Sequence, residues 1–411
     1  MRGLNYGWSM MTPAEPQVTP LEAWPQIEAY IRSKKPGNLH RHPNGSLSPA
    51  SMAALYRESP TACEIFCDLY KADPTDPAVI RQVIDSALQG EVDWERFEHA
   101  FNPGRILLDN DPDLHIHREW FRRLVVESAE QGLACVGFRA TFGGHWRSQI
   151  DFERVITSAV EGVLEGEEQA IHAVLFVGIR KETPPQEAAR ILQQWLDIRR
   201  KLENAHPESA RKLYGVDSIG SESSFDVSAQ QPVFARALAN GMTLCYHLGE
   251  TWKPGELAAK PNQIAELLDR VKVSYLTNPI ALFVDRATLD RRLYSEAEIN
   301  QIGSLQQAIL AQLIESTVIV EISPTGNELL TRKNRQQEGW SFYPLQEMIA
   351  RNLRVVITDD DSTIFKTSYL EEYKKLFSGS TPYGRLGFDD LTKVVDQCQH
   401  IIEGFEQHDQ S

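Results

Sequence analysis

The stretch Asn38-Leu39-His40-Arg41-His42-Pro43-Asn44-Gly45-Ser46 reads as the end of a buried strand that runs into a polar turn. His40 and His42 are two residues apart, so on a strand both imidazoles point to the same side. Imidazole nitrogens are favoured zinc ligands, and two of them at one strand end supply half of a zinc site. An isolated His-x-His pair is more often two ordinary loop histidines, so the stretch needs partners elsewhere in the chain.

Composition sets the class of protein. The chain has 411 residues, of which 42% are hydrophobic, enough for a large core. Its net charge of −15 argues against binding to a nucleic-acid polymer or an anionic membrane, although a locally positive pocket can still take a small anion. Five cysteines, an odd and low number, are typical of reduced thiols in a cytoplasm. With no leader pattern and no long apolar run, we expect a cytoplasmic protein without a membrane anchor.

Short apolar runs alternate with stretches of helical spacing, which predicts parallel strands joined by helical crossovers. The runs lie at 39–42, 133–140, 173–179, 214–219, 242–248, 271–276, 318–322 and 353–358. Eight such units close a (β/α)8 TIM barrel of the α/β class, and a doubly wound open sheet is the alternative. The barrel predicts that chemistry follows the carboxyl ends of the strands.

Three regions are expected along the chain. Residues 1–35 form an N-terminal arm and helix, 36–375 the barrel, and 376–411 a C-terminal helical tail. Extra helices at 60–130 interrupt the barrel between its first and second strands. This insertion is long enough to be a lid over the barrel mouth or a subunit contact, and the sequence leaves a homo-oligomer or a protein partner open.

Two further strand ends carry side chains that suit a metal site. The fifth run ends at His247, with Glu250 three residues later, and the eighth runs into Asp359-Asp360-Asp361. An acidic cluster after an apolar strand needs a cation, a hydrogen-bonded partner or open water, and its alternative role is a solvated helix cap. The set that fits one zinc ion per chain, with a position open for water, is His40, His42, His247 and Asp359.

The chemistry of such a site follows from its residues. Zinc lowers the pKa of a bound water toward about 7, which gives a hydroxide nucleophile at neutral pH. Glu250 lies one turn from a ligand and can deliver a proton to the attacked atom or to the leaving group. Asp360, beside the metal, can hydrogen-bond the substrate or the water.

Taken in order, these motifs resemble the adenosine deaminase family of metal-dependent hydrolases, from about residue 36 to 375. Residues 40–46 are similar to the family's first motif, residues 247–250 to its His-Ala-Gly-Glu motif, and residues 358–360 to its Thr-Asp-Asp motif. Residues 216–222 resemble the family's strand-four motif, whose glycine contacts the purine. The motifs lie at 40–46, 216–222, 247–250 and 358–360, with a weaker echo of a Cys-Pro-x-Ser-Asn motif at 323–327.

The resemblance implies a zinc enzyme that removes the amino group of a 6-aminopurine as ammonia. It implies zinc on the four residues of the set and Glu250 as the proton shuttle to the ring nitrogen. Gly220 and Asp360 are the implied contacts to the base, and Asp217 of the same strand-four motif joins the expected substrate-binding residues. The implied partner is a small purine nucleotide or nucleoside.

Asn44 departs from the nucleoside deaminases, which usually have Asp at this position near the ribose 5′ end. The branch that resembles N6-methyl-AMP deaminase usually has Asn. A carboxylate would repel a phosphate, whereas an amide can donate to it. Asn-Gly is also a good turn pair, which is the structural alternative. We favour the nucleotide interpretation.

The family's Ile-Gly-His-Gly motif after strand six is missing. Its histidine orients the hydroxide, but here the region reads Tyr275-Leu276-Thr277-Asn278, and no histidine occurs between His247 and His400. Asn278 is the expected occupant of the position, with Tyr275 second. Losing an acid/base group commonly costs ~10²–10⁴ in rate.

Other side chains enter as weaker candidates. His145 follows the second run and joins the expected substrate-binding residues, with an ordinary loop histidine as its alternative. Arg41 and Arg147 are candidates for a phosphate, with surface charges as the alternative.

The sequence therefore favours a zinc-dependent deaminase of a 6-aminopurine nucleotide or nucleoside. The missing histidine favours an alternative, a weakened or inactive deaminase-like protein that binds a nucleotide and acts through partners. A third interpretation keeps the metal and hydrolyses another amide or amine. Family members also occur in bacterial antiphage systems, and the sequence is compatible with such a role.

Overall fold

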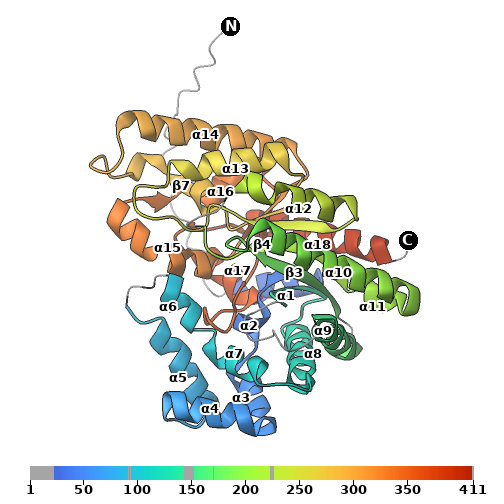
Figure 1. Cartoon of the computed structure of the whole chain (residues 1–411). Helices are drawn as coiled ribbons and strands as arrows, with labels where there is room; N and C mark the ends of the chain where they lie inside the picture. The colour runs from blue at the N-terminus through green and yellow to red at the C-terminus, as the bar shows by residue number, and fades with distance from the viewer. Residues whose placement is uncertain are drawn as a thin grey trace.

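Eight parallel strands form a nearly closed barrel at the centre of the molecule (Figure 1). The computed structural model describes residues 23–409 apart from 91, 93, 143–151, 170 and 223–225. The strands are β1 Gly37–Arg41, β2 Cys135–Ala140, β3 His172–Arg180, β4 Leu213–Ile219, β5 Thr243–His247, β6 Tyr275–Thr277, β8 Ile319–Ile322 and β10 Val355–Ile357. Each pairs with the next in this order. The predicted (β/α)8 TIM barrel is confirmed.

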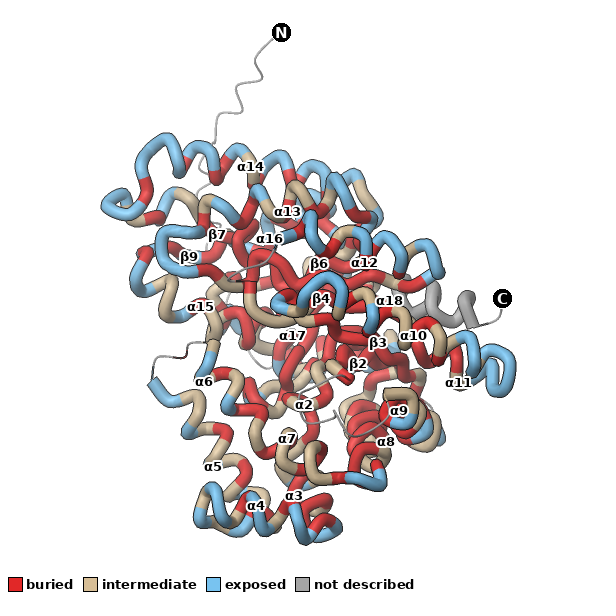
Figure 2. Tube along the Cα trace, in the orientation of Figure 1, coloured by how far each residue is buried: buried red, intermediate tan, exposed pale blue. Residues whose placement is uncertain are grey.

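The barrel closes between its first and last strands. Arg41 and Asp360 form a parallel bridge, and the backbone N–H of His42 donates to the carbonyl of Asp360 at 3.2 Å. The strands are buried along most of their length, as Figure 2 shows for the centre of the molecule. Continuous burial explains why they appear in the sequence as apolar runs and not as alternating patterns.

Helices surround the barrel and supply the crossovers. Two of them are followed by glycine in the left-handed conformation, Gly339 and Gly379, which lets the chain turn sharply at the helix end. The helices after β2 are α9 Phe152–Gly166, α10 Pro185–Ala205, α11 Pro207–Arg211, α12 Val227–Ala239, α13 Ala259–Arg270, α14 Glu296–Glu315, α15 Pro324–Glu338, α16 Leu345–Ala350, α17 Tyr369–Ser378 and α18 Phe388–Asp409. Two short antiparallel strands, β7 Val284–Asp285 and β9 Ser341–Phe342, pair outside the barrel.

A group of helices between β1 and β2 forms the lower part of the molecule in Figure 1. Ser48 and Asp76 cap two of them through their side chains, which fixes where each helix begins. The ring of Phe97 stacks on Phe365, 5.7 Å between centroids, and joins this group to the loop after β10. The helices are α2 Pro43–Ser46, α3 Pro49–Glu58, α4 Pro60–Tyr70, α5 Pro77–Ala87, α6 Trp94–His99, α7 Asn102–Asp109 and α8 His115–Glu130.

The first and last helices pack together near the amino ends of the strands. The hydroxyl of Tyr30, on α1 Trp24–Ser33, donates to Asp396 of α18 at 3.0 Å. The thiol of Cys398 donates to the carbonyl of Gly37, where β1 begins, at 2.9 Å. The carboxyl ends of the strands are therefore the open end of the barrel. Across the described residues, no helix combines the length and the apolar character needed to cross a membrane.

Candidate active site and metal centre

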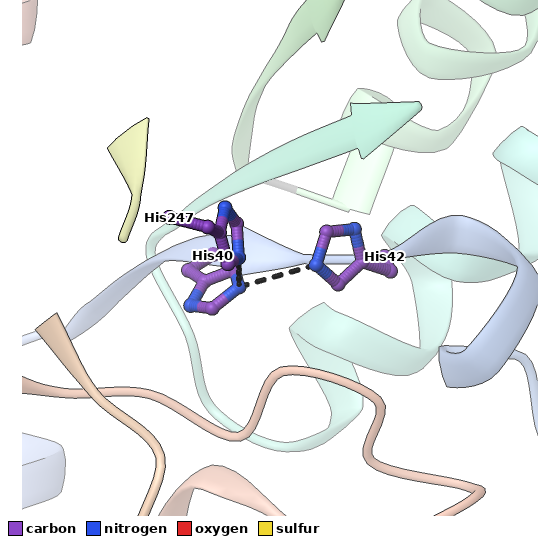
Figure 3. A group of neighbouring side chains, drawn as sticks. All are labelled: His40, His42 and His247. Atoms are coloured by element: carbon purple, nitrogen blue, oxygen red, sulfur yellow. Dashed lines mark hydrogen bonds between the residues drawn. The ribbon is translucent and has the colours of Figure 1, made fainter. Parts of the chain in front are cut away.

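Three imidazoles meet at the carboxyl end of the barrel (Figure 3). His40 and His42 come from the end of β1, and His247 from the end of β5. The Nε2 atom of His40 lies 3.3 Å from that of His42 and 3.1 Å from that of His247. These three side chains could together hold a metal ion.

Each imidazole has a hydrogen-bond partner at its Nδ1 atom. Asp217 Oδ1 accepts from His247 at 3.1 Å and the carbonyl of Arg139 accepts from His42 at 3.1 Å, while the Thr358 hydroxyl lies 3.2 Å from Nδ1 of His40. The carboxylate and the carbonyl can only accept, so they place the ring proton of His247 and His42 on Nδ1, and the Thr358 hydroxyl can accept from His40 in the same way. In this arrangement the Nε2 lone pairs of all three rings face one another. Three facing lone pairs repel unless a proton or a cation lies between them. The donor set therefore fits a metal ion.

The carboxylate beside the three rings belongs to Asp360. Its Oδ1 atom lies 3.3 Å from Nε2 of both His40 and His42. The prediction that Asp359 completes this group is wrong by one residue. Asp359 Oδ1 accepts from Nε of Arg41 at 2.9 Å and also from Asn38, so its carboxylate is fully engaged away from the imidazoles.

The backbone explains the shift of one residue. Side chains alternate along a strand, so Arg41 points away from the side that His40 and His42 face. Asp359 follows Arg41 to that other side. Asp360 then adopts a left-handed conformation with φ +56°, which turns its carboxylate back toward the rings. Ser46 supports the turn by donating to the carbonyl of Asp360 at 2.9 Å.

Asp361 is a site residue that the sequence analysis missed. It lines the cavity above the histidines, and its buried Oδ1 has no hydrogen-bond partner among the described residues. Burial and the nearby carboxylates of Asp360 and Glu250 raise the pKa of Asp361 well above its usual range. A Cβ at Gly45 would lie 1.8 Å from this oxygen, so only glycine leaves room for the carboxyl group.

Asn278 lies between Glu250 and Asp360. Its Nδ2 donates to Glu250 Oε1 at 2.9 Å and to Asp360 Oδ2 at 3.0 Å. The backbone N–H of Ser323 donates to Asn278 Oδ1 at 3.1 Å and fixes the direction of the amide. Burial raises the pKa of the Glu250 carboxyl to about 7. Tyr275, the second candidate for this position, belongs instead to an apolar cluster that includes Cys398, near the opposite end of the barrel.

A buried Glu222 holds the turn that carries Glu250. Its two oxygens accept from the backbone N–H groups of Gly249 at 3.0 Å and Glu250 at 2.9 Å. Lys260 donates to Glu222 at 3.0 Å, and Lys181 lies 4.0 Å away and donates to the carbonyl of Gly220 at 3.0 Å. One ionic cluster thus fixes both Glu250 and the strand-four glycine.

The remaining predicted residues divide between the cavity and the interior. Asn44 and Gly220, the latter with φ +91°, line the cavity. Asp217 was expected to bind substrate, but its carboxylate is buried against His247, and its second oxygen lies 3.5 Å from Arg139. Against the effect of burial, the charges of His247 and Arg139 hold the pKa of Asp217 well below its usual range. Asp217 therefore orients an imidazole.

Of the three weaker candidates for substrate or phosphate binding, only one lies in the described part of the chain. Arg41 is buried and bound to Asp359, Ser128 and Gln131, so it does not face the cavity. His145 and Arg147 lie outside the described residues.

A cavity lies over the histidines, with about 880 Å³ of space between its lining atoms, part of which is open solvent. Aromatic rings from the helical insertion and from the loop after β10 form much of its wall. They are Trp94, Phe97, Phe101 and Phe365. An aromatic wall above a polar floor suits a flat heteroaromatic ring that presents polar edges to the floor.

Known proteins resemble this chain in sequence and in fold. A curated adenine deaminase from Bordetella parapertussis is 25% identical over 233 residues, 56% of this chain and 60% of that protein. The structure of an amidohydrolase from Burkholderia ambifaria with bound zinc superposes with a TM-score of 0.64 at 16% identity, over 90% of this chain and 86% of that one. That of N6-mAMP deaminase from Arabidopsis gives 0.61 at 14% identity, over 92% and 99%.

These likenesses to solved structures concern the fold. The sequence itself carries the assignment, because the adenosine deaminase family model matches residues 36–395, most of the chain. That match includes every strand of the barrel and the four motifs at 40–46, 216–222, 247–250 and 358–360. The chain belongs to the adenosine deaminase family.

Proposed function

We propose that this protein is a zinc-dependent hydrolase that removes the amino group of a 6-aminopurine nucleotide or nucleoside and releases ammonia. One observation carries the proposal. Three imidazole nitrogens and the Asp360 carboxylate converge on one point, and Glu250 and Asp361 line the same cavity. The named activities of the similar proteins, adenine deaminase and N6-mAMP deaminase, support the same class of reaction.

His40, His42, His247 and Asp360 would hold the zinc. Nitrogen and carboxylate oxygen are its preferred ligands, and the acceptors behind the rings leave their Nε2 lone pairs available. Zinc bound there supplies an activated water as the nucleophile.

Glu250 serves as the proton carrier. A carboxyl group whose pKa is raised to about 7 is divided between its two forms near neutral pH, so it can both accept and donate a proton. Asn278 donates to one oxygen of Glu250 and leaves the other oxygen to face the substrate. The clamp that Glu222 makes on the turn keeps the carboxyl group in place.

Asp361 forms a hydrogen bond to the purine ring. Burial and the neighbouring carboxylates raise the pKa of Asp361 and so favour its protonated form, whose O–H can donate to a ring nitrogen. Gly220 approaches the base from the end of β4, and the aromatic wall covers the ring faces. Asp361 thus takes the role of base contact that the sequence analysis gave to Asp360.

A second candidate function rests on Asn278. An amide donates hydrogen bonds but cannot carry a proton in the reaction, and the family has histidine at this position. A protein with this site could bind a nucleotide, turn it over slowly or not at all, and act through partners. Both candidates use the same cavity, so only a measurement of turnover separates them.

The test is hydrolysis by the zinc-loaded full chain, followed as ammonia release from adenine, adenosine and AMP and as methylamine release from N6-methyl-AMP. We expect release from at least one of them and its loss in Glu250→Gln, with zinc content unchanged. Glu256→Gln, an exposed residue of the same loop, is the matched control and should retain activity. Zinc binding and nucleotide binding without release of ammonia or methylamine would refute the deaminase and support the second candidate.

A further inference from the structure

Two arginines and a glutamate form a second charged group in the wall of the active-site cavity. Glu98 comes from α6, Arg105 from α7, and Arg180 from the end of β3. Arg105 pairs with Glu98 through its guanidinium and also donates to the Glu98 carbonyl at 3.0 Å. Arg180 donates to the other carboxylate oxygen of Glu98 at 3.3 Å. Two guanidiniums from different elements therefore converge on one carboxylate.

The position of this group relates it to the metal centre. All three residues line the same cavity as His247 and Glu250. Arg105 follows Gly104, whose Cβ, if it had one, would lie 3.3 Å from the carbonyl of Asn44. The group thus lies beside the Asn44 turn, within the cavity that the substrate enters.

The second side of the group adjoins the turn after β4. Arg180 precedes Lys181, which donates to the carbonyl of Gly220. Glu182, also paired with Arg180 at 3.4 Å, would touch a Cβ at Gly220. A purine held near Gly220 and Asp361 therefore has this group within the same enclosure.

The side chains remain open to a ligand. The exposed fractions are 31% for Arg105, 40% for Arg180 and 21% for Glu98, in contrast to the completely buried Arg139. Guanidinium groups bind phosphate and carboxylate oxygens with the same forked geometry. The Glu98 carboxylate thus occupies the kind of place that the oxygens of an anionic ligand group would take.

We propose that Arg105 and Arg180 bind the phosphate of a purine nucleoside 5′-monophosphate, and that Glu98 yields this place to it. The inference rests on the proposed function and narrows its substrate to nucleotides. A chain of charge −15 with several acidic groups in its cavity needs local cations to admit a dianion. While Glu98 and Glu182 are paired with the two arginines, the four charges cancel. Exchange of Glu98 for phosphate replaces one ionic contact with another and leaves no guanidinium unpaired.

The test compares binding of IMP and inosine, the deamination products, to the full chain by calorimetry, so that no turnover is needed. We expect IMP to bind more tightly than inosine. Arg105→Gln and Arg180→Gln should each weaken IMP by about 10–100-fold and leave inosine unchanged. Arg190→Gln, which breaks an exposed arginine–glutamate pair on α10, is the matched control and should change neither.

Glu98→Gln is the second variant, and its effect has the opposite sign. It removes the competing charge, so IMP should bind several-fold more tightly while inosine is unchanged. Equal affinity for IMP and inosine, absence of IMP binding, or arginine variants that leave IMP unaffected would overturn the assignment. Weakening of both ligands alike by Glu98→Gln would also overturn it, because Glu98 would then bind the sugar.

The outcomes separate this inference from the deaminase itself. Ammonia release with the same kcat/KM from adenosine and AMP would retain the deaminase and refute the phosphate site. Arginine-dependent IMP binding without release of ammonia or methylamine from any substrate would do the reverse.

Discussion

Two groups of buried charges lie in the barrel, one below the histidines and one around them, and they are built in opposite ways. Below, the Arg139 guanidinium donates to both oxygens of Glu321 at 2.6 Å, to Thr277 at 2.8 Å and to the carbonyl of Leu39 at 3.0 Å. Every group there has a partner from the chain itself.

Around the histidines the acids outnumber the donors. Asp360, Asp361 and Glu250 share a small volume with three imidazole lone pairs, and Asn278 supplies one amide to two of them. A buried carboxylate without a partner is costly, so a ligand or a cation is needed to stabilise this group. The lower group maintains the barrel, and the upper group is arranged for something that the chain does not contain.

Breaking the lower group should have the largest effect. Arg139→Met leaves Glu321 buried without its cation, and we expect a loss of about 3–5 kcal/mol in the free energy of unfolding, measured with urea. Arg139→Met with Glu321→Met should recover part of that loss. A double variant no more stable than Arg139→Met alone would contradict the interpretation of the pair as mutually dependent.

Breaking the upper group should affect the metal. Asp360→Asn should lower zinc affinity by at least about 100-fold, because it removes the charged oxygen beside two imidazoles. Asp359→Asn is the control of the same chemistry one residue earlier, and it should retain zinc while weakening the Arg41 pair. Equilibrium dialysis against a chelator gives both affinities. The reverse order of affinities would restore the register expected from the sequence.

A substitution at Gly45 tests whether the Asp361 carboxyl group needs the space beside this glycine. Gly45→Ala places a methyl group on the carboxylate oxygen, and we expect a loss of about 1–3 kcal/mol in stability together with reduced substrate binding. Thermal unfolding and calorimetry measure the two effects. Gly387→Ala, where the nearest atom to the new Cβ is 3.6 Å away, should be nearly neutral.

The smallest effect is expected behind one imidazole. Thr358→Val removes the hydroxyl that hydrogen-bonds Nδ1 of His40, and zinc affinity should fall by about 10-fold, the low end for such supporting partners. The free energy of unfolding without metal should change by less than it does in Arg139→Met. Unchanged zinc affinity would mean that packing alone orients His40.

The barrel was predictable because fully buried strands and their crossovers leave a strong alternation in the sequence. The ends of the strands were predictable for the same reason, which is how His40, His42, His247 and Glu250 were found. Asp359 and Asp360 were confused because the chain has three consecutive aspartates after β10. No periodicity applies there, and the left-handed turn at Asp360 that selects the inward carboxylate arises from contacts with β1.

The role of a side chain could not be predicted from the sequence where it depends on a partner far away in the chain. Asp217 was found by its motif, but its partner His247 lies 30 residues away, so its supporting role was hidden. Arg139 did leave a signal, because a charged residue inside an apolar run indicates a buried ion pair. Arg105 and Arg180 resembled ordinary surface charges until the fold brought them to one cavity.

Closure of the barrel by its last strand has a consequence for how the protein is made. The hydroxyl of Thr358 and the imidazole of His40 are 318 residues apart in the chain. The backbone bridge between β1 and the segment after β10 joins Arg41 to Asp360. During synthesis the first two histidines leave the ribosome long before their carboxylate partner exists. The complete donor set for a metal ion therefore comes together only when the final strand joins the barrel.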